Sequence, residues 1–152
     1  MPLRHDSRED YLTALLHLSG AGDAVSTSAL AGRLGVAPAS ATGMLKTLAR
    51  EGLVAHERYR GAQLSPLGRE RALAVVRRHR LVETFLVGTL GLPADRVHAE
   101  AHRLEHALSD EVVERLDRWL GRPRLDPHGS PIPPAARSPR AKAKADSRAR
   151  ER

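Results

Sequence analysis

The chain has 152 residues, of which 25 are Lys or Arg and 18 are Asp or Glu, and this length suits one domain with an appendage. Aromatic residues make up only 3% and cysteine is absent, which argues against a β-sandwich or barrel and excludes disulfides, thiolate metal sites and a cysteine nucleophile. No apolar run approaches the roughly 18 residues of a membrane span, and the N-terminus lacks a signal peptide's apolar stretch, so we expect a cytoplasmic protein without a membrane partner.

Helix caps and apolar spacing predict the elements in chain order. Three helices run over about residues 6–19, from 26 or 27 to 34, and from 38 to just before Gly52. Residues 53–57 and 62–65 form two short strands around a turn at 58–61. Ser65 and Pro66 begin a long helix to about Leu90, and two more helices follow at about 94–108 and 110–120. We therefore predict a mainly α fold, with an N-terminal winged helix-turn-helix domain (1–72) and a second, α-helical domain (73–136).

The last residues differ in composition from the rest of the chain. Residues 137–152 hold seven basic and two acidic residues, whereas residues 79–136 hold seven basic and nine acidic ones. No apolar residue larger than alanine occurs from Ser138 onward, so we expect 137–152 to form a disordered basic tail. Two roles stay open for this tail, a solubilising end and non-specific attraction to DNA.

The short turn between the second and third helices predicts a helix-turn-helix that binds nucleic acid. In such a pair the later helix, here the one that begins at residue 38, enters the major groove. This helix offers donors to phosphates but, at its N-terminal end, no Arg, Asn or Gln for a bidentate base contact, so we expect backbone contacts with modest direct readout. A winged helix that contacts protein is the alternative. The candidate DNA-binding residues are Thr27, Ala37, Ala39, Ser40, Thr42, Gly43, Lys46 and Arg50, together with Arg58 and Arg60 of the wing.

Histidine and glutamate residues recur at helical spacing in the second half of the chain. His79 and Glu83 stand one turn apart on the long helix. On the next helix, one arc of about 100° beside an apolar stripe holds His98, His102, Glu105 and His106. Imidazoles and carboxylates that converge from different helices can bind a metal, and a set with only N and O ligands suits Mn²⁺, Fe²⁺, Co²⁺, Ni²⁺ or Zn²⁺.

Two other interpretations of this cluster remain open. His102, Glu105 and His106 also match the H-x-x-E-H pattern of inverted zinc peptidases, in which Glu105 would be a general base. We do not expect an enzyme, because no segment is left over to form a cleft for a small organic substrate. A metal-independent winged-helix regulator with a permanently filled structural site is the second alternative.

Several short segments together resemble the DtxR/MntR family of metal-dependent transcriptional repressors, the diphtheria-toxin-repressor-like proteins. They are residues 9–12 (Glu-Asp-Tyr-Leu), 59–61 (Tyr-Arg-Gly), 64–68 (Leu-Ser-Pro-Leu-Gly), 78–83 (Arg-His-Arg-Leu-Val-Glu) and 97–111, the last being the most specific. The resemblance implies a repressor that senses Mn²⁺ or Fe²⁺ and binds a palindromic DNA operator as a homodimer. It also implies that the second domain binds the metal and forms the dimer.

The resemblance implies two metal sites. By position, the regulatory site consists of Asp10, His102, Glu105 and His106, and the ancillary site consists of His79, Glu83 and His98. Thr13 and His102 stand where the manganese-sensing branch has glutamates, and Gly43 stands where the iron-sensing branch has a base-reading glutamine. The oxygen ligand at Asp10 favours Mn²⁺, closely followed by Fe²⁺, and Zn²⁺, Co²⁺ or Ni²⁺ can substitute. The basic tail stands where longer members carry an SH3-like domain, so we expect a short form.

Overall fold

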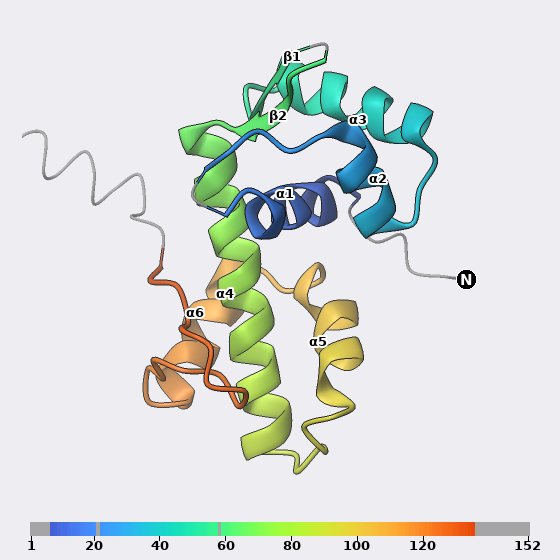
Figure 1. The fold of residues 1–152 in the computed structure, drawn as a ribbon. Helices are drawn as coiled ribbons and strands as arrows, with labels where there is room; N and C mark the ends of the chain where they lie inside the picture. Colours follow the sequence, from blue (N-terminus) through green and yellow to red (C-terminus); the bar gives the residue numbers. More distant parts are fainter. Residues whose placement is uncertain (1–6, 21, 58, 136–152) are drawn as a thin grey trace, which may run out of the picture.

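The structure, a computed structural model, describes residues 7–20, 22–57 and 59–135. Within these ranges the elements are α1 (Ser7–Leu18), α2 (Thr27–Leu34), α3 (Pro38–Arg50), β1 (Val54–Glu57), β2 (Gly61–Leu64), α4 (Pro66–Gly88), α5 (Val97–Glu105) and α6 (Asp110–Trp119). Helices α1–α3 and the hairpin form the upper half in Figure 1, and α4 runs down from them to α5 and α6. The predicted mainly α fold is confirmed. None of the described helices is long and apolar enough to cross a membrane.

The helix-turn-helix forms where its caps predicted it. The Ser26 side chain accepts a hydrogen bond from the Ala29 backbone N–H at the start of α2, and Gly35 ends this helix in the left-handed region at φ 65°. Pro38 then opens α3, where its missing N–H costs no hydrogen bond. The fully buried core of this half contains Leu15, Leu30, Leu45, Leu48 and Leu53.

The wing is an antiparallel hairpin in which Val54 lies opposite Leu64. Val25, before α2, extends it by exchanging two backbone hydrogen bonds of 2.8 Å with Ala62. The segment between α1 and α2 is thereby fixed to the hairpin, so the upper half is one packed unit.

The long helix α4 begins against the winged helix through a close backbone contact. Ser65 caps α4 by accepting from the Gly68 N–H at 3.0 Å, and its hydroxyl donates to the Gly52 carbonyl at 2.7 Å. A Cβ atom at position 68 would lie 1.9 Å from the carbonyl oxygen of Leu53. Glycine is therefore needed where α4 leaves the winged helix, and this contact sets the direction in which α4 runs toward the metal-ligand candidates.

Replacing Gly68 with alanine is expected to lower the free energy of unfolding by about 2 kcal/mol, because α4 or the Leu53 backbone must shift to make room. Urea denaturation measures the change. The matched control is Gly88→Ala at the other end of α4, where nothing lies near a built Cβ. Equal stability of the two variants would contradict the close contact.

The lower half has its own apolar core along α4. Val82 and Leu86 pack against Val97 and Ala101 of α5, while Leu81 packs with Val113 of α6. Ile132, from the segment that follows α6, completes the second cluster. The chain after α6 therefore folds back onto α4.

Helix α5 is shorter than the sequence predicted, and some predictions lie outside the described residues. α5 begins at Val97 instead of near Ala94, because the Arg96 and Val97 N–H groups both bond the Pro93 carbonyl in a turn. It ends at Glu105, with His106 as its cap, whereas the sequence predicted residue 108. α4 passes without interruption through 72 and 73, the predicted domain boundary. Arg58 and residues 137–152 lie outside the described part of the chain.

Candidate metal centre and nucleic-acid interface

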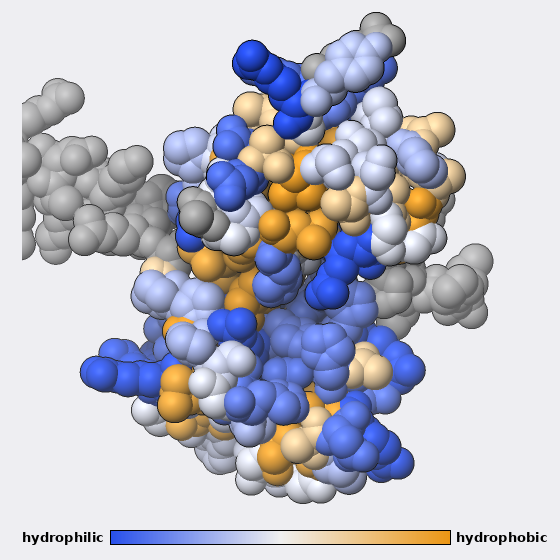
Figure 2. All heavy atoms as spheres, viewed as in Figure 1, coloured by the Kyte–Doolittle hydropathy of each residue, from blue (hydrophilic) through white to orange (hydrophobic). Residues whose placement is uncertain are grey.

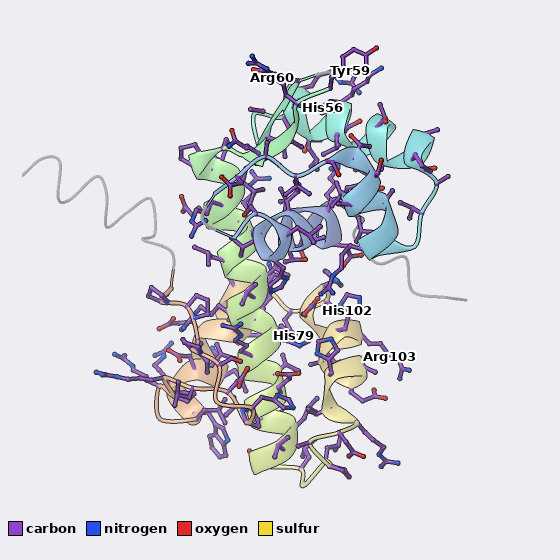
Figure 3. All side chains as sticks on the ribbon, in the orientation of Figure 1. His56, Tyr59, Arg60, His79, His102 and Arg103 are labelled. Atoms are coloured by element: carbon purple, nitrogen blue, oxygen red, sulfur yellow. The ribbon has the colours of Figure 1, made fainter. Side chains whose placement is uncertain are left out.

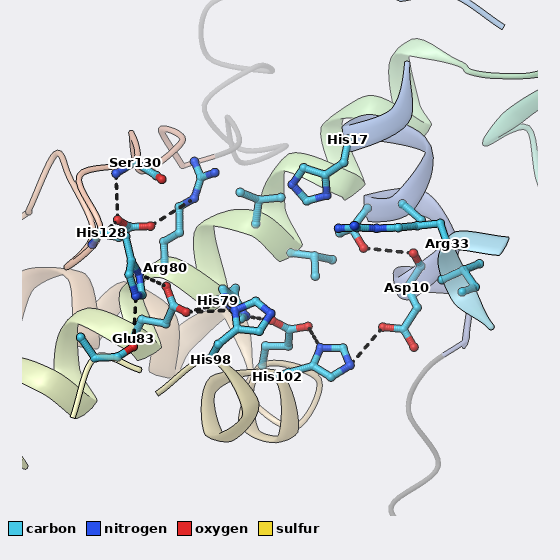
Figure 4. A pocket seen from close by; sticks show the side chains of 18 of the residues that line it. Asp10, His17, Arg33, His79, Arg80, Glu83, His98, His102, His128 and Ser130 are labelled. Atoms are coloured by element: carbon cyan, nitrogen blue, oxygen red, sulfur yellow. Dashed lines mark hydrogen bonds and ion pairs between the residues drawn. The ribbon is translucent and has the colours of Figure 1, made fainter. Parts of the chain in front are cut away.

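Asp10 of α1 faces three ligand candidates on and just after α5. Its Oδ1 lies 3.3 Å from His106 Nε2 and 3.8 Å from His102 Nε2. Glu105 Oε1 lies 2.8 Å from His102 Nδ1 and 3.2 Å from His106 Nε2. One donor atom from each of the four residues therefore lies within 4.8 Å of the others. Figure 4 shows His102 between α1 and the histidines of the lower half.

These four residues fit a divalent transition metal by their chemistry. The set offers two imidazole nitrogens and two carboxylate oxygens, the ligand types that Mn²⁺, Fe²⁺ and Zn²⁺ share. It also joins two distant parts of the chain, since Asp10 belongs to the winged helix and the others to the lower half. A cation bound there would link the two halves.

Glu9 holds this group in place and was missed as a site residue by the sequence analysis. Its Oε2 lies 2.7 Å from His106 Nδ1, so the other ring nitrogen of His106 faces Asp10 and Glu105. Arg78 of α4 donates to Glu9 at 3.1 Å and to the Glu105 carbonyl at 3.0 Å. A carboxylate on the far nitrogen orients a ligand histidine and fixes its tautomer. The consecutive acidic residues at 9 and 10 were the available signal.

The predicted ancillary residues also converge. His79 Nε2 lies 3.0 Å from Glu83 Oε1 and 3.0 Å from His98 Nδ1. His98 Nδ1 lies 3.2 Å from the same Glu83 oxygen, and the two imidazole rings meet edge to face. Glu83 is buried, with 2% of its surface exposed, whereas His98 is largely exposed. The group is therefore open to solvent on one side.

His79 connects the two groups. Its Nδ1 lies 2.6 Å from Glu105 Oε2, while its Nε2 faces Glu83 and His98. In Figure 3, His79 lies between α4 and α5 with His102 nearby, whereas Arg103 points outward. Burial alone would lower the pKa of His79, but its contacts with Glu105 and Glu83 outweigh burial and raise the pKa to about 9. Burial alone would raise the pKa values of Glu83 and Glu105. Their contacts with histidines outweigh burial and lower both pKa values. A charged His79 therefore pairs with both carboxylates and offsets part of their charge when no metal is bound.

The stability of the metal-free protein is expected to fall at alkaline pH. Because the His79 pKa is raised, its contribution is complete below the ordinary value of 6.5 and is lost as the pH rises through about 9. The loss reaches about 3 kcal/mol for a shift of this size. Urea denaturation in EDTA at pH 6.5 and 9.5 measures it, and His79→Gln should flatten the dependence. An equally steep loss in His79→Gln would contradict the assignment.

A loop after α6 brings two further ligand candidates to Glu83, and the sequence analysis did not single them out. His128 Nδ1 lies 3.5 Å from Glu83 Oε2, and Asp126 lies in the same group of potential ligand atoms. Asp126 shapes this loop by accepting from the N–H groups of His128 and Ser130 at 2.9 and 2.8 Å. Arg80 pairs with Asp126 at 3.6 Å. The loop therefore forms a third group of ligand candidates, Glu83, Asp126 and His128, which shares Glu83 with the ancillary group.

All three groups border one cavity of about 760 Å³ between the two halves. His17 and Arg33 line it from the winged-helix half, and Arg80 and Ser130 line it from the other half (Figure 4). Burial and the nearby Arg33 and Arg80 lower the pKa of His17. Figure 2 shows hydrophilic residues gathered across the middle of this face, below the apolar surface of the winged helix. The junction of the halves is therefore polar and reachable by ions.

Those predicted DNA-binding residues that the structure describes lie on α2, on α3 and its N-cap, and on the wing. Most of those on α3 are exposed, but the Thr42 hydroxyl donates to the Pro38 carbonyl at 3.0 Å and Arg50 folds back onto Thr47 and the Lys46 carbonyl. Arg60 pairs with Glu57 at 3.3 Å. Figure 3 shows His56, Tyr59 and Arg60 at the tip of the wing. Tyr59, which the sequence analysis did not include among these candidates, is 91% exposed beside Arg60.

Two family models together match most of the chain. Residues 5–62 match the model described as "Iron dependent repressor, N-terminal DNA binding domain", and residues 65–134 match "Iron dependent repressor, metal binding and dimerisation domain". The chain belongs to the iron-dependent repressor family. The junction of the two matches coincides with Ser65, the cap of α4.

Members of the iron-dependent repressor family with similar sequences include the iron-dependent repressor IdeR of Mycobacterium tuberculosis (strain ATCC 25618 / H37Rv) and the diphtheria toxin repressor of Corynebacterium diphtheriae. Each is 38% identical to this chain over 128 residues, which cover 84% of it. The same residues cover 56% and 57% of these relatives, so the chain spans little more than half of their length.

Solved structures similar to this chain include two repressors with bound metal. A structure titled "Manganese-dependent transcriptional repressor complex with manganese" has a TM-score of 0.77 and 48% identity, and one of ScaR with bound Zn²⁺ has a TM-score of 0.75 and 39% identity. In both, the match covers 84% of this chain and 59% of the other. The predicted DtxR/MntR resemblance is thereby confirmed, and Mn²⁺ and Fe²⁺ are the metals that the family binds.

Proposed function

We propose that this protein is a transcriptional repressor that binds a palindromic DNA operator as a homodimer when Mn²⁺ or Fe²⁺ is bound. The observation that carries the proposal is the convergence of Asp10, from the DNA-binding half, with His102, Glu105 and His106 of the other half. Donors on both sides of the junction allow one ion to control the position of α1. Membership of the iron-dependent repressor family supports the same function.

The protein's own residues prepare this junction. Arg78 and Glu9 join α4, α1 and α5 before any ion binds, and Glu9 aims His106 at Asp10. A divalent ion supplies positive charge that carboxylates and neutral imidazoles can share. Asp10 then holds α1 close to α5, which reduces the freedom of the winged helix and fixes the recognition helix α3 for two half-sites of the operator. Metal and DNA affinities must be reciprocally linked.

Dimer formation is assigned to the lower half. The match to a dimerisation domain covers residues 65–134. Within that range the exposed large apolar side chains include Leu90, Leu104, Val112 and Trp119. Apolar side chains left exposed in this number are typical of a surface that another molecule covers. We assign that molecule to a second copy of the chain.

The peptidase alternative receives no support from the geometry. Glu105 is 4% exposed and is held by His79 and His102, so it is not positioned to activate water. The relatives are named as repressors, not enzymes. The H-x-x-E-H string instead supplies three donors of the regulatory group.

A metal titration of DNA binding tests the proposed function. Duplexes selected from a random library in Mn²⁺ supply the operator, and fluorescence anisotropy measures affinity with Mn²⁺, with Fe²⁺ under anaerobic conditions, and with EDTA. We expect binding at least about 100-fold tighter with either metal, an effect of typical allosteric size. Equal affinity in EDTA would overturn the proposal, and unfolding in EDTA, seen by circular dichroism, would favour a structural metal site.

A further inference from the structure

Tyr59 is an exposed aromatic residue in a chain that has very few aromatic side chains. The chain holds only two tyrosines, one tryptophan and one phenylalanine. Tyr11 and Phe85 pack in the cores of the two halves, whereas Trp119 belongs to the exposed apolar surface assigned above to a second copy. Tyr59 takes part in neither core and in none of the metal groups. Its place at the tip of the wing therefore indicates a contact with another molecule.

The backbone at Tyr59 adopts a conformation that a tyrosine rarely takes. Its φ is 66°, in the left-handed region, and among the described residues only one other non-glycine residue, Arg122, has a positive φ. A side chain is disfavoured in this region, which glycine adopts at lower cost. Backbone strain that persists at an exposed turn is more common at functional sites than elsewhere. The conformation therefore favours a binding role for the Tyr59 side chain.

The base of the wing fixes the position of this tip. Val25 exchanges two 2.8 Å backbone hydrogen bonds with Ala62, and Gln63 Nε2 donates to the Gly22 carbonyl at 2.8 Å. A Cβ atom at position 61 would lie 2.4 Å from the Val25 carbonyl oxygen, so β2 lies directly against the segment before α2. The wing therefore presents Tyr59 from a base that is packed on the rest of the winged helix.

The helix-turn-helix beside the wing carries cations and no acidic residue. Residues 24–50, which include α2 and α3, hold three basic residues and no acidic one, and Arg58 and Arg60 flank Tyr59 in the sequence. β1 packs against α3, and Figure 3 shows Tyr59 above α3 in this view. A helix that fills the major groove, about 12 Å wide, places a neighbouring hairpin over the flanking sugar–phosphate backbone. A tyrosine hydroxyl can donate to a phosphate there.

We propose that Tyr59 binds the sugar–phosphate backbone of duplex DNA beside the groove that α3 enters, with its hydroxyl donating to a phosphate. The inference rests on the proposed function, which brings DNA to α3 and the wing. The contact positions the wing without reading the base sequence. Because a neutral hydroxyl displaces no counterion, the contact adds affinity without changing the salt dependence of binding.

Chemical modification of Tyr59 is the first test. The probe is a mixed-sequence DNA duplex in EDTA, so that neither the operator nor the metal enters. Tetranitromethane nitrates exposed tyrosines, and the other tyrosine, Tyr11, is 5% exposed. We expect a saturating concentration of the duplex to slow the nitration of Tyr59 several-fold, as measured by mass spectrometry of peptides. Nitration at an unchanged rate would overturn the proposal and leave the tip of the wing to a protein partner.

Tyr59→Gly is the second test, because glycine removes the side chain and suits the left-handed backbone. Its affinity for the same duplex should fall about 5-fold, the effect of one hydrogen bond to a charged group at an exposed site. Anisotropy between about 50 and 200 mM KCl should show an unchanged slope of log affinity against log salt. The urea midpoint should not fall, because glycine relieves the strain. Full affinity in Tyr59→Gly would overturn the proposal, and so would weaker binding accompanied by a lower urea midpoint.

Lys46→Gln separates this proposal from the proposed function. Lys46 is an exposed cation of α3, so its loss should weaken binding and make the salt slope shallower by about 0.9. If Lys46→Gln had this effect and Tyr59→Gly bound normally, the tyrosine contact alone would be overturned. If neither variant weakened binding, the DNA interface of the proposed function would fail together with it. A failure of metal dependence at the operator leaves this comparison unaffected.

Discussion

Asp10→Ala is expected to abolish metal-dependent DNA binding while leaving the fold intact. Asp10 is the member of the regulatory group that comes from the DNA-binding half, and its Oδ1 lies within 4 Å of both His102 and His106. Loss of this ligand should weaken Mn²⁺ binding at the regulatory group at least about 100-fold. Loss of a residue that only orients a ligand, without touching the metal, usually costs less. Whatever metal remains bound to α5 alone can no longer position α1. DNA affinity in saturating Mn²⁺ should therefore equal that in EDTA.

Asp23→Ala is the matched control for Asp10→Ala. Asp23 is an exposed carboxylate just after α1, so the variant makes the same change in charge within the same half. It should retain the full response to metal. Calorimetric titration with Mn²⁺ and anisotropy on the selected operator measure the two quantities. A normal metal response in Asp10→Ala would refute the link between α1 and α5.

Glu105→Gln is expected to impair both metal binding and the metal-free fold. The Glu105 carboxylate is 4% exposed and contacts His79 and His102 through different oxygens. A glutamine turns an N–H₂ group toward one of these nitrogens and leaves the charged His79 without one of its two carboxylates. Breaking a buried charge pair in this way costs about 3 kcal/mol. Mn²⁺ affinity at the regulatory group should fall at least about 100-fold, because a charged ligand is lost.

Glu100→Gln provides the comparison on the same helix. Glu100 is 45% exposed and contacts Arg103 at 2.6 Å, and exposed pairs of this kind contribute less than about 1 kcal/mol. Its variant should bind Mn²⁺ normally and unfold at nearly the unchanged urea concentration. If both variants retained full Mn²⁺ affinity, Glu105 would not be a ligand.

Local rules were sufficient to predict most of the fold. Ser26 and Ser65 cap α2 and α4 as expected, and Gly35 ends α2, because these effects act within one turn of the chain. The common face of His102, Glu105 and His106 likewise follows from helical spacing. The start of α5 was placed too early, because Pro93 accepts the first N–H groups in a turn whose geometry the residue types do not determine.

Contacts between distant segments were harder to predict. Periodicity could not decide whether Glu9 or Asp10 faces the metal ligands, since both lie on α1 and its orientation depends on packing against α4. The resemblance assigned Asp10, and the structure adds Glu9 beside His106. Asp126 and His128 reach Glu83 through an irregular loop that Arg80 fastens, and no periodic signal marks such a loop. That these groups bind a metal stays a prediction.

Hydrogen exchange of α1 tests the central claim, that metal fixes α1 against α5, most directly. Mass spectrometry would follow the amides of residues 7–18 with EDTA and with Mn²⁺, in the unchanged protein and in Asp10→Ala. The account predicts that Mn²⁺ slows exchange in α1 at least about 10-fold in the unchanged protein, since ordering by a ligand protects the segment it fixes, and has no effect in Asp10→Ala. Exchange in α1 that is the same with and without Mn²⁺, in a protein that binds DNA only with Mn²⁺, would contradict it.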